Sequence, residues 1–138
     1  MQKLFILSFL VLFSIDLSAQ QAKLSGSDGK LKYDVKVEKL TDEKNDIFYE
    51  YYSLEIKNTS TSEVTFTPVF NYKTETGDLR SSLSHDGNQS ITLAPGESIK
   101  GNPKDSYNLT LFKEFLVGNS GKKSSNNVYT LNSISINY

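Results

Sequence analysis

The sequence predicts an all-β protein, an antiparallel sandwich of about seven or eight short strands that follows an N-terminal export signal. Two observations favour strands: apolar and polar residues alternate with period two over several segments, and turn-forming Gly, Pro, Asn and Ser residues separate these segments. A third observation excludes helical classes, because no helical periodicity is present after the signal. A small closed barrel is the alternative architecture.

Residues 1–19 have the pattern of a signal peptide. Lys3 supplies the positive start, residues 4–13 form an apolar run, and Ser18-Ala19 offers a small-residue cleavage site. The apolar run is shorter than the roughly 20 residues of a membrane-spanning helix. We therefore expect a periplasmic or secreted protein without membrane insertion after signal cleavage.

The composition limits the possible partners and cofactors. The chain has no cysteine, so it has neither disulfides nor thiolate metal sites. Its 15 Lys and Arg nearly balance 16 Asp and Glu, and they are scattered, which argues against nucleic acid as a partner. Residues 20–29 are polar and predict a flexible leader that ends in an Asp28-Gly29 turn. The remaining residues, 30–138, suit a single domain.

Three long strands are predicted in the first half of the domain. The first covers 30–38, where apolar residues alternate with charged ones. The second is 47–58 and the third is 64–73, and we expect these two to form a long hairpin. Pro68 cannot donate to a ladder, which predicts an edge position or a bulge. The expected inward residues of this pair are Phe48, Tyr52, Leu54, Ile56, Val64, Phe66, Phe70 and Tyr72.

Shorter strands are predicted in the second half. They cover 79–83, 90–93 and 98–100, and the last two flank a turn in which Gly96 takes a positive φ. The strand at 107–117 changes phase near Phe112, which predicts a bulge there. Residues 119–127 read as a solvated loop, and 128–138 as the closing strand.

The segment from Leu54 to Gly101 resembles the immunoglobulin-like accessory domains of exported bacterial proteins. The resemblance rests on the LEIKNTSTSEVTFTPVF segment and the later ITLAPGESIKG turn, and covers about a third of the chain. It implies an immunoglobulin-like sandwich that serves as a binding, adhesive or structural module. It implies no catalytic residue.

The candidate catalytic and metal sites are each interpreted more simply as ordinary solvated loops. The one histidine, His85, follows Ser84 and precedes Asp86, but neighbours in a single loop lack the fixed geometry of a catalytic triad. The cluster Asp42, Glu43, Asn45 and Asp46 offers oxygen ligands for calcium, yet its spacing is not that of a calcium-binding loop, so a solvated turn is favoured. We expect no catalytic residue, no metal and no cofactor.

Tyr49 and Tyr51 are the strongest candidates for recognition. Residues two apart on a strand share a face, so both rings are expected to point outward beside Glu55 and Lys57. Alternatively, the two rings are covered or form cross-strand pairs. The sequence therefore predicts a non-enzymatic binding module that presents this face to a protein or glycan. The alternative function is an inhibitor or immunity-like protein that blocks an exported enzyme through the loops 80–88 or 119–127.

Overall fold

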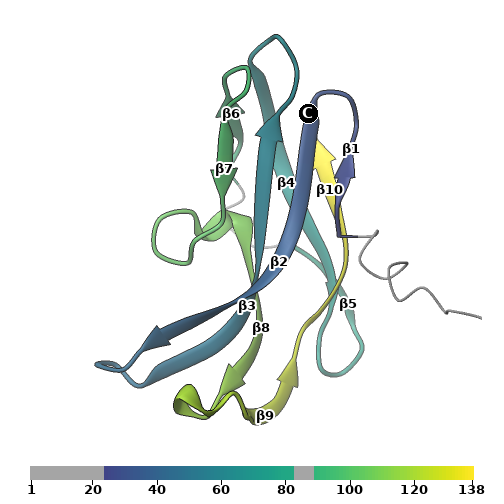
Figure 1. The fold of residues 1–138 in the computed structure, drawn as a ribbon. Coiled ribbons are helices and arrows are strands. Elements are labelled where there is room, and N and C mark those ends of the chain that lie inside the picture. The colour runs from purple at the N-terminus through teal and green to yellow at the C-terminus, as the bar shows by residue number, and fades with distance from the viewer. Residues whose placement is uncertain (1–23, 83–88) are drawn as a thin grey trace, which may run out of the picture.

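The computed structural model describes residues 24–82 and 89–138, which form an all-β sandwich of two antiparallel sheets (Figure 1). The predicted signal peptide at 1–19 lies outside the described residues. The larger sheet contains β1 (Gly26–Ser27), β2 (Leu31–Asp42), β3 (Ile47–Asn58), β7 (Ser98–Lys100), β8 (Thr110–Leu116) and β9 (Lys123–Val128). The smaller sheet contains β4 (Val64–Lys73), β5 (Leu79–Ser81), β6 (Ile91–Leu93) and β10 (Thr130–Asn137). Two short 3-10 turns, η3 (Tyr107–Leu109) and η4 (Gly118–Ser120), flank β8.

The core lies between the two sheets. Alternate residues of β3 and β4 face each other there, as their period-two patterns predicted, and are joined by residues of β2, β6 and β10. Phe48, which was also predicted to point inward, is partly buried and lies outside this core. The most deeply buried apolar side chains are Leu31, Leu54, Ile56, Phe66, Phe70, Leu93 and Leu109. Within the described ranges, no helix is long and apolar enough to cross a membrane.

The long hairpin consists of β2 and β3, and the expected pairing of β3 with β4 is wrong. The β2–β3 register runs from Leu31 opposite Asn58 to Asp42 opposite Ile47. The turn is closed by Asp42, whose carboxylate accepts hydrogen bonds from the backbone N–H and the Nδ2 of Asn45, at 3.2 and 2.8 Å. Periodicity predicted which side chains of β3 and β4 point inward, but two inward-facing strands are equally compatible with opposite sheets.

Asn58 holds the crossing from β3 to β4 in place. Its side chain is fully buried, and its Nδ2 donates to the carbonyl oxygens of Ser62 and Leu93, at 2.7 and 3.0 Å. Its Oδ1 accepts hydrogen bonds from the N–H and the hydroxyl of Ser60. Its backbone bonds to Glu97 and Gly96, so one residue ties together two of the three described connections between the sheets, β3–β4 and β6–β7.

The second of these connections, residues 94–97, joins the sheets and is not a hairpin turn. β6 pairs with β4, whereas β7 pairs with β3. Gly96 has φ +77°, the left-handed conformation that the Pro-Gly turn predicted. The turn chemistry was therefore right, but it does not specify whether the next strand returns to the same sheet.

Pro68 lies in β4, which is a central strand and not an edge strand, but at Pro68 itself one side of the strand has no described partner, so the predicted edge position holds locally. β6 pairs with β4 up to Phe66, and β5 pairs from Asn71 onward, which leaves a gap between the two partners. The N–H of Phe70, two residues away, points to this side and donates to the Ser82 hydroxyl at 3.0 Å. The backbone N of Pro68 therefore faces a position at which no described strand needs a hydrogen-bond donor.

Two polar segments that were expected to lack structure form strands. Gly26–Ser27 pairs with β2, so ordered structure begins before residue 30, within the predicted flexible leader. Lys123–Val128, expected to be loop, pairs with β8 as β9. Both are edge strands without apolar alternation, because neither buries a full face, and periodicity does not detect such strands.

Replacing Asn58 by Ala should lower the free energy of unfolding by about 3 kcal/mol, because buried backbone groups at the β3–β4 and β6–β7 connections lose their partners. Asn71→Ala is the matched control, since Asn71 donates only to the hydroxyls of Ser133 and Ser135 on the outside of β4. Its expected loss is at most about 1 kcal/mol. Urea denaturation measures both, and equal losses would refute the role given to Asn58.

Candidate functional site

The four residues predicted to contact a partner share the outer face of the larger sheet. Tyr52, Leu54 and Ile56 belong to the core, so the alternate residues of β3 point away from it. Glu55 and Lys57 are exposed, as predicted. Tyr51 is only 6% exposed and Tyr49 is partly buried, so the expectation of two freely exposed tyrosines is wrong.

Side chains on the same outer face cover Tyr51. Its hydroxyl donates to the Glu38 carboxylate on β2 at 3.1 Å, and Glu38 also forms an ion pair with Lys100 on β7. The Lys100 hydrogen bond lowers the pKa of Glu38, with a smaller contribution from Tyr51. Burial, followed by the Glu38 hydrogen bond, raises the pKa of Tyr51. The tyrosine therefore serves as a structural support of this face.

Two phenylalanines of β8 complete an aromatic cluster that sequence reasoning missed. The rings of Phe112 and Phe115 are 4.7 Å apart between centroids, and Tyr49 lies 5.8 and 6.4 Å from them. Tyr51 joins edge-on, 6.0 Å from Tyr49. We call Tyr49, Tyr51, Phe112 and Phe115 the outer aromatic cluster.

A bulge at Lys113 brings both phenylalanines to one face, and it confirms the phase change predicted near Phe112. Phe112 pairs with Tyr51 and Phe115 with Tyr49, so β8 spans three residues where β3 spans two. Lys113 is the extra residue. In a regular strand, positions three apart point to opposite faces, and Phe112 and Phe115 could not stack.

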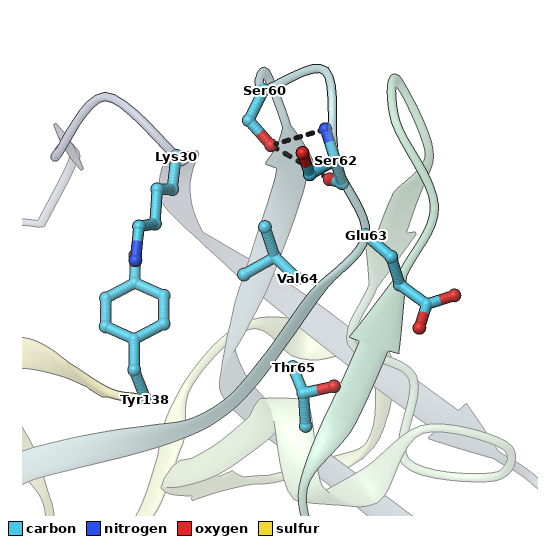
Figure 2. Close-up of a pocket in the computed structure, with 7 residues that line it drawn as sticks. All are labelled: Lys30, Ser60, Ser62, Glu63, Val64, Thr65 and Tyr138. Carbon is cyan, nitrogen blue, oxygen red and sulfur yellow. Dashed lines mark hydrogen bonds between the residues drawn. The ribbon is translucent and has the colours of Figure 1, made fainter.

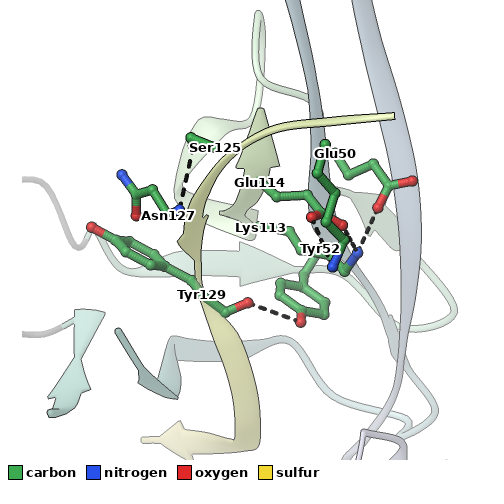
Figure 3. A network of polar contacts seen from close by, with 8 residues as sticks. Glu50, Tyr52, Lys113, Glu114, Ser125, Asn127 and Tyr129 are labelled. Carbon is green, nitrogen blue, oxygen red and sulfur yellow. Dashed lines mark hydrogen bonds and ion pairs between the residues drawn. The ribbon is translucent and has the colours of Figure 1, made fainter. Parts of the chain in front are cut away.

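An ion network on the opposite face holds the bulge (Figure 3). The Lys113 ammonium contacts carboxylate oxygens of Glu50 and Glu114 at 2.5 and 2.6 Å, and Lys123 lies 3.3 Å from Glu114. Glu114 is buried, and burial alone would raise its pKa, but the hydrogen bond from Lys113 and the ion pair with Lys123 outweigh burial and lower it. Despite its own burial, the pKa of Lys113 is raised by Glu114 and Glu50.

The exposed part of the outer aromatic cluster is apolar. Phe115 is 44% exposed, and Ile47 and Val117 lie two residues along the chain from Tyr49 and Phe115 respectively. Ile47 and Val117 are 40% and 54% exposed. Phe112 connects the cluster to the core, because it contacts Tyr129, whose ring stacks on Tyr72. The surface is thus an exposed apolar patch that is anchored to the core through Phe112.

The described residues do not assemble the candidate metal or catalytic sites considered in the sequence analysis. In the described ranges, no three Asp, Glu or His side chains are placed to share a metal ion. In the segment proposed for calcium, Asp42 closes the hairpin turn and Glu43 accepts a hydrogen bond from Asn119. His85 lies outside the described residues.

A shallow hollow of about 370 Å³ opens at the other end of the sandwich (Figure 2). It is lined by Lys30, Ser60, Ser62, Glu63, Val64, Thr65 and Tyr138. The Lys30 ammonium lies over the Tyr138 ring, 4.5 Å from its centroid, and Ser60 is hydrogen-bonded within its own turn. Several of its polar groups are therefore engaged with the protein itself.

No protein-family model, curated protein or solved structure matches the chain. The resemblance to immunoglobulin-like accessory domains therefore stays a prediction, and the argument for function depends on the surface itself.

Replacing Lys113 by Met should destabilise the fold by about 3 kcal/mol at neutral pH, because Glu50 and buried Glu114 lose the cation between them. Lys123→Met is the matched control and should cost less, since the Lys123 side chain is 63% exposed. Urea denaturation measures both losses.

The pH dependence separates this electrostatic effect from a packing defect. In the parent protein the lowered pKa of Glu114 adds stability above the ordinary glutamate pKa, and this stability is lost as the pH falls. In Lys113→Met, burial should raise the pKa of Glu114. Protonation at low pH then removes the cost of burying its unpaired charge. The stability gap between parent and variant should narrow as the pH falls. A constant gap would contradict this account.

Proposed function

We propose that this protein is an exported, non-catalytic binding module of immunoglobulin-like fold, and that the exposed side of the outer aromatic cluster contacts its partner. The observation that carries the proposal is the partial exposure of Phe115 on a surface that the fold braces from behind. A rigid aromatic side chain loses little conformational entropy on binding, which makes it suited to anchor an interface.

The composition of the patch favours a protein as the partner. Its most exposed aromatic ring is Phe115, a phenylalanine without a hydrogen-bonding group, and the exposed aliphatic residues Ile47 and Val117 lie two positions along the chain from Tyr49 and Phe115. The Glu38–Lys100 ion pair borders the cluster, and exposed Glu55 and Lys57 lie further along the same face. An apolar centre with a charged rim is the usual anatomy of a protein interface.

Phe115→Ala is the sharpest probe of this surface. Tyr51→Ala would remove the hydrogen bond to Glu38 and leave a void, so a loss of binding could result from misfolding. Leu79→Ala is the control, because Leu79 is a 71% exposed apolar residue on the smaller sheet. Circular dichroism and thermal unfolding would verify that all three proteins are equally folded.

The test is affinity capture from envelope and medium fractions, followed by titration of the captured partner. A protein bound by the parent and by Leu79→Ala, but at least about tenfold more weakly by Phe115→Ala, would support the proposed surface. Equal binding by all three would refute it, and a captured glycan would refute a protein partner. If the captured protein is an enzyme that loses its activity, the inhibitor function applies.

A further inference from the structure

Among the described residues, the edge of β2 that faces away from β3 is paired with another strand near its start alone. β1 covers Lys32 and Tyr33, and Leu24, the first described residue, packs against the core. From Asp34 onward, no described strand lies beside β2 on this side. Figure 1 shows this part of β2 as the outermost strand of the larger sheet. An open edge of this length favours the addition of another strand.

The backbone orientation of β2 determines which residues such a strand would meet. Leu31 donates its N–H to the Asp28 carboxylate at 2.9 Å and accepts the Asp28 N–H at 3.2 Å, both on the β1 side. The Lys30 carbonyl instead accepts from Thr59, on the β3 side. The alternation along the strand directs the N–H and C=O groups of Val35, Val37 and Lys39 toward the open edge.

A second copy of the chain fits this edge in one register. Antiparallel pairing centred on Val37 joins the edge-facing groups of residues 35, 37 and 39 and places Lys36 opposite Glu38 of the second copy, twice by symmetry. Centring on Val35 would pair Val37 of the second copy with Tyr33, but the edge-facing backbone groups of Tyr33 already pair with β1. Centring on Lys36, Glu38, Lys39 or Leu40 would bring like charges together, and centring on Thr41 would run past Asp42, where β2 ends. Both the backbone and the charges therefore select Val37.

We propose that the protein forms a symmetric dimer in which the free edge of β2 pairs with β2 of a second copy about Val37. Val37 is 49% exposed, an unusual position for an apolar side chain on an open edge, and its self-pairing would cover it. Lys36 is exposed, so it is free to reach Glu38 of the second copy. The ladder is short, so we expect a dimer that dissociates on dilution.

The symmetry has a consequence for binding. A two-fold axis perpendicular to the sheet keeps outer faces together, so both outer aromatic clusters lie on one side of the dimer. A partner with two sites would then bind with avidity. The dimer itself does not depend on the proposed function.

Sedimentation equilibrium of the purified chain over a range of concentrations tests the dimer. Val37→Pro removes an N–H that points to the second copy, not to β3, and proline is tolerated at sheet edges. Val37→Thr keeps the N–H and a branched side chain, and is the matched control. We expect dimers for the parent and Val37→Thr, and a folded monomer for Val37→Pro. A monomeric parent, or an equally dimeric Val37→Pro, would overturn the proposal.

Cysteine cross-linking tests the register, and it also decides the matter if Val37→Pro does not fold. The chain has no cysteine, so Lys36→Cys and Glu38→Cys each introduce a single thiol. These positions would face each other as a non-hydrogen-bonded pair, with Cα atoms about 4.5 Å apart, which suits a disulfide. A mixture of the two variants should cross-link much more than either alone. Equal cross-linking of one variant by itself, or none in the mixture, would contradict the register.

Discussion

The bulge at Lys113 is the constraint on which the candidate surface depends. One extra residue in β8 lets Phe112 and Phe115 stack on the same face beside Tyr49, and it turns Lys113 and Glu114 together toward the opposite face. A bulge interrupts the ladder, so it needs compensating interactions. Ion pairs on one side of the sheet and aromatic contacts on the other supply them. The apolar patch and its charged support therefore form one unit.

Different interactions stabilise the two ends of the larger sheet. Near Asn58, the core and the inter-sheet connections hold the sandwich together. Toward the β2–β3 turn, core burial gives way to exposed residues such as Val37 and Ile47, and the contacts are aromatic and ionic instead. Stability is thus concentrated away from the end with the exposed apolar groups, as expected of a surface available for binding.

Local patterns predicted much of the fold but less of the site. The inward residues of β3, the phase change in β8 and the turn at Gly96 all follow from period or backbone preference, which act over a few residues. Pairing partners do not, so β3 was assigned the wrong neighbour and β9 was missed. The burial of Tyr51 likewise depends on Glu38 and Phe112, which lie on other strands. The sequence signal that could have indicated the cluster was the predicted bulge next to Phe112 and Phe115, because one extra residue brings these two positions to the same face.

Nuclear Overhauser contacts among the assigned aromatic rings would test the central claim most directly, because they report which side chains share a face. The account predicts that the Tyr49 ring contacts both Phe112 and Phe115 and that the two phenylalanines contact each other. A regular β8 ladder would place Phe115 on the core side. Contacts of Phe115 with core residues, and none with Phe112 or Tyr49, would contradict the bulge and the surface built on it.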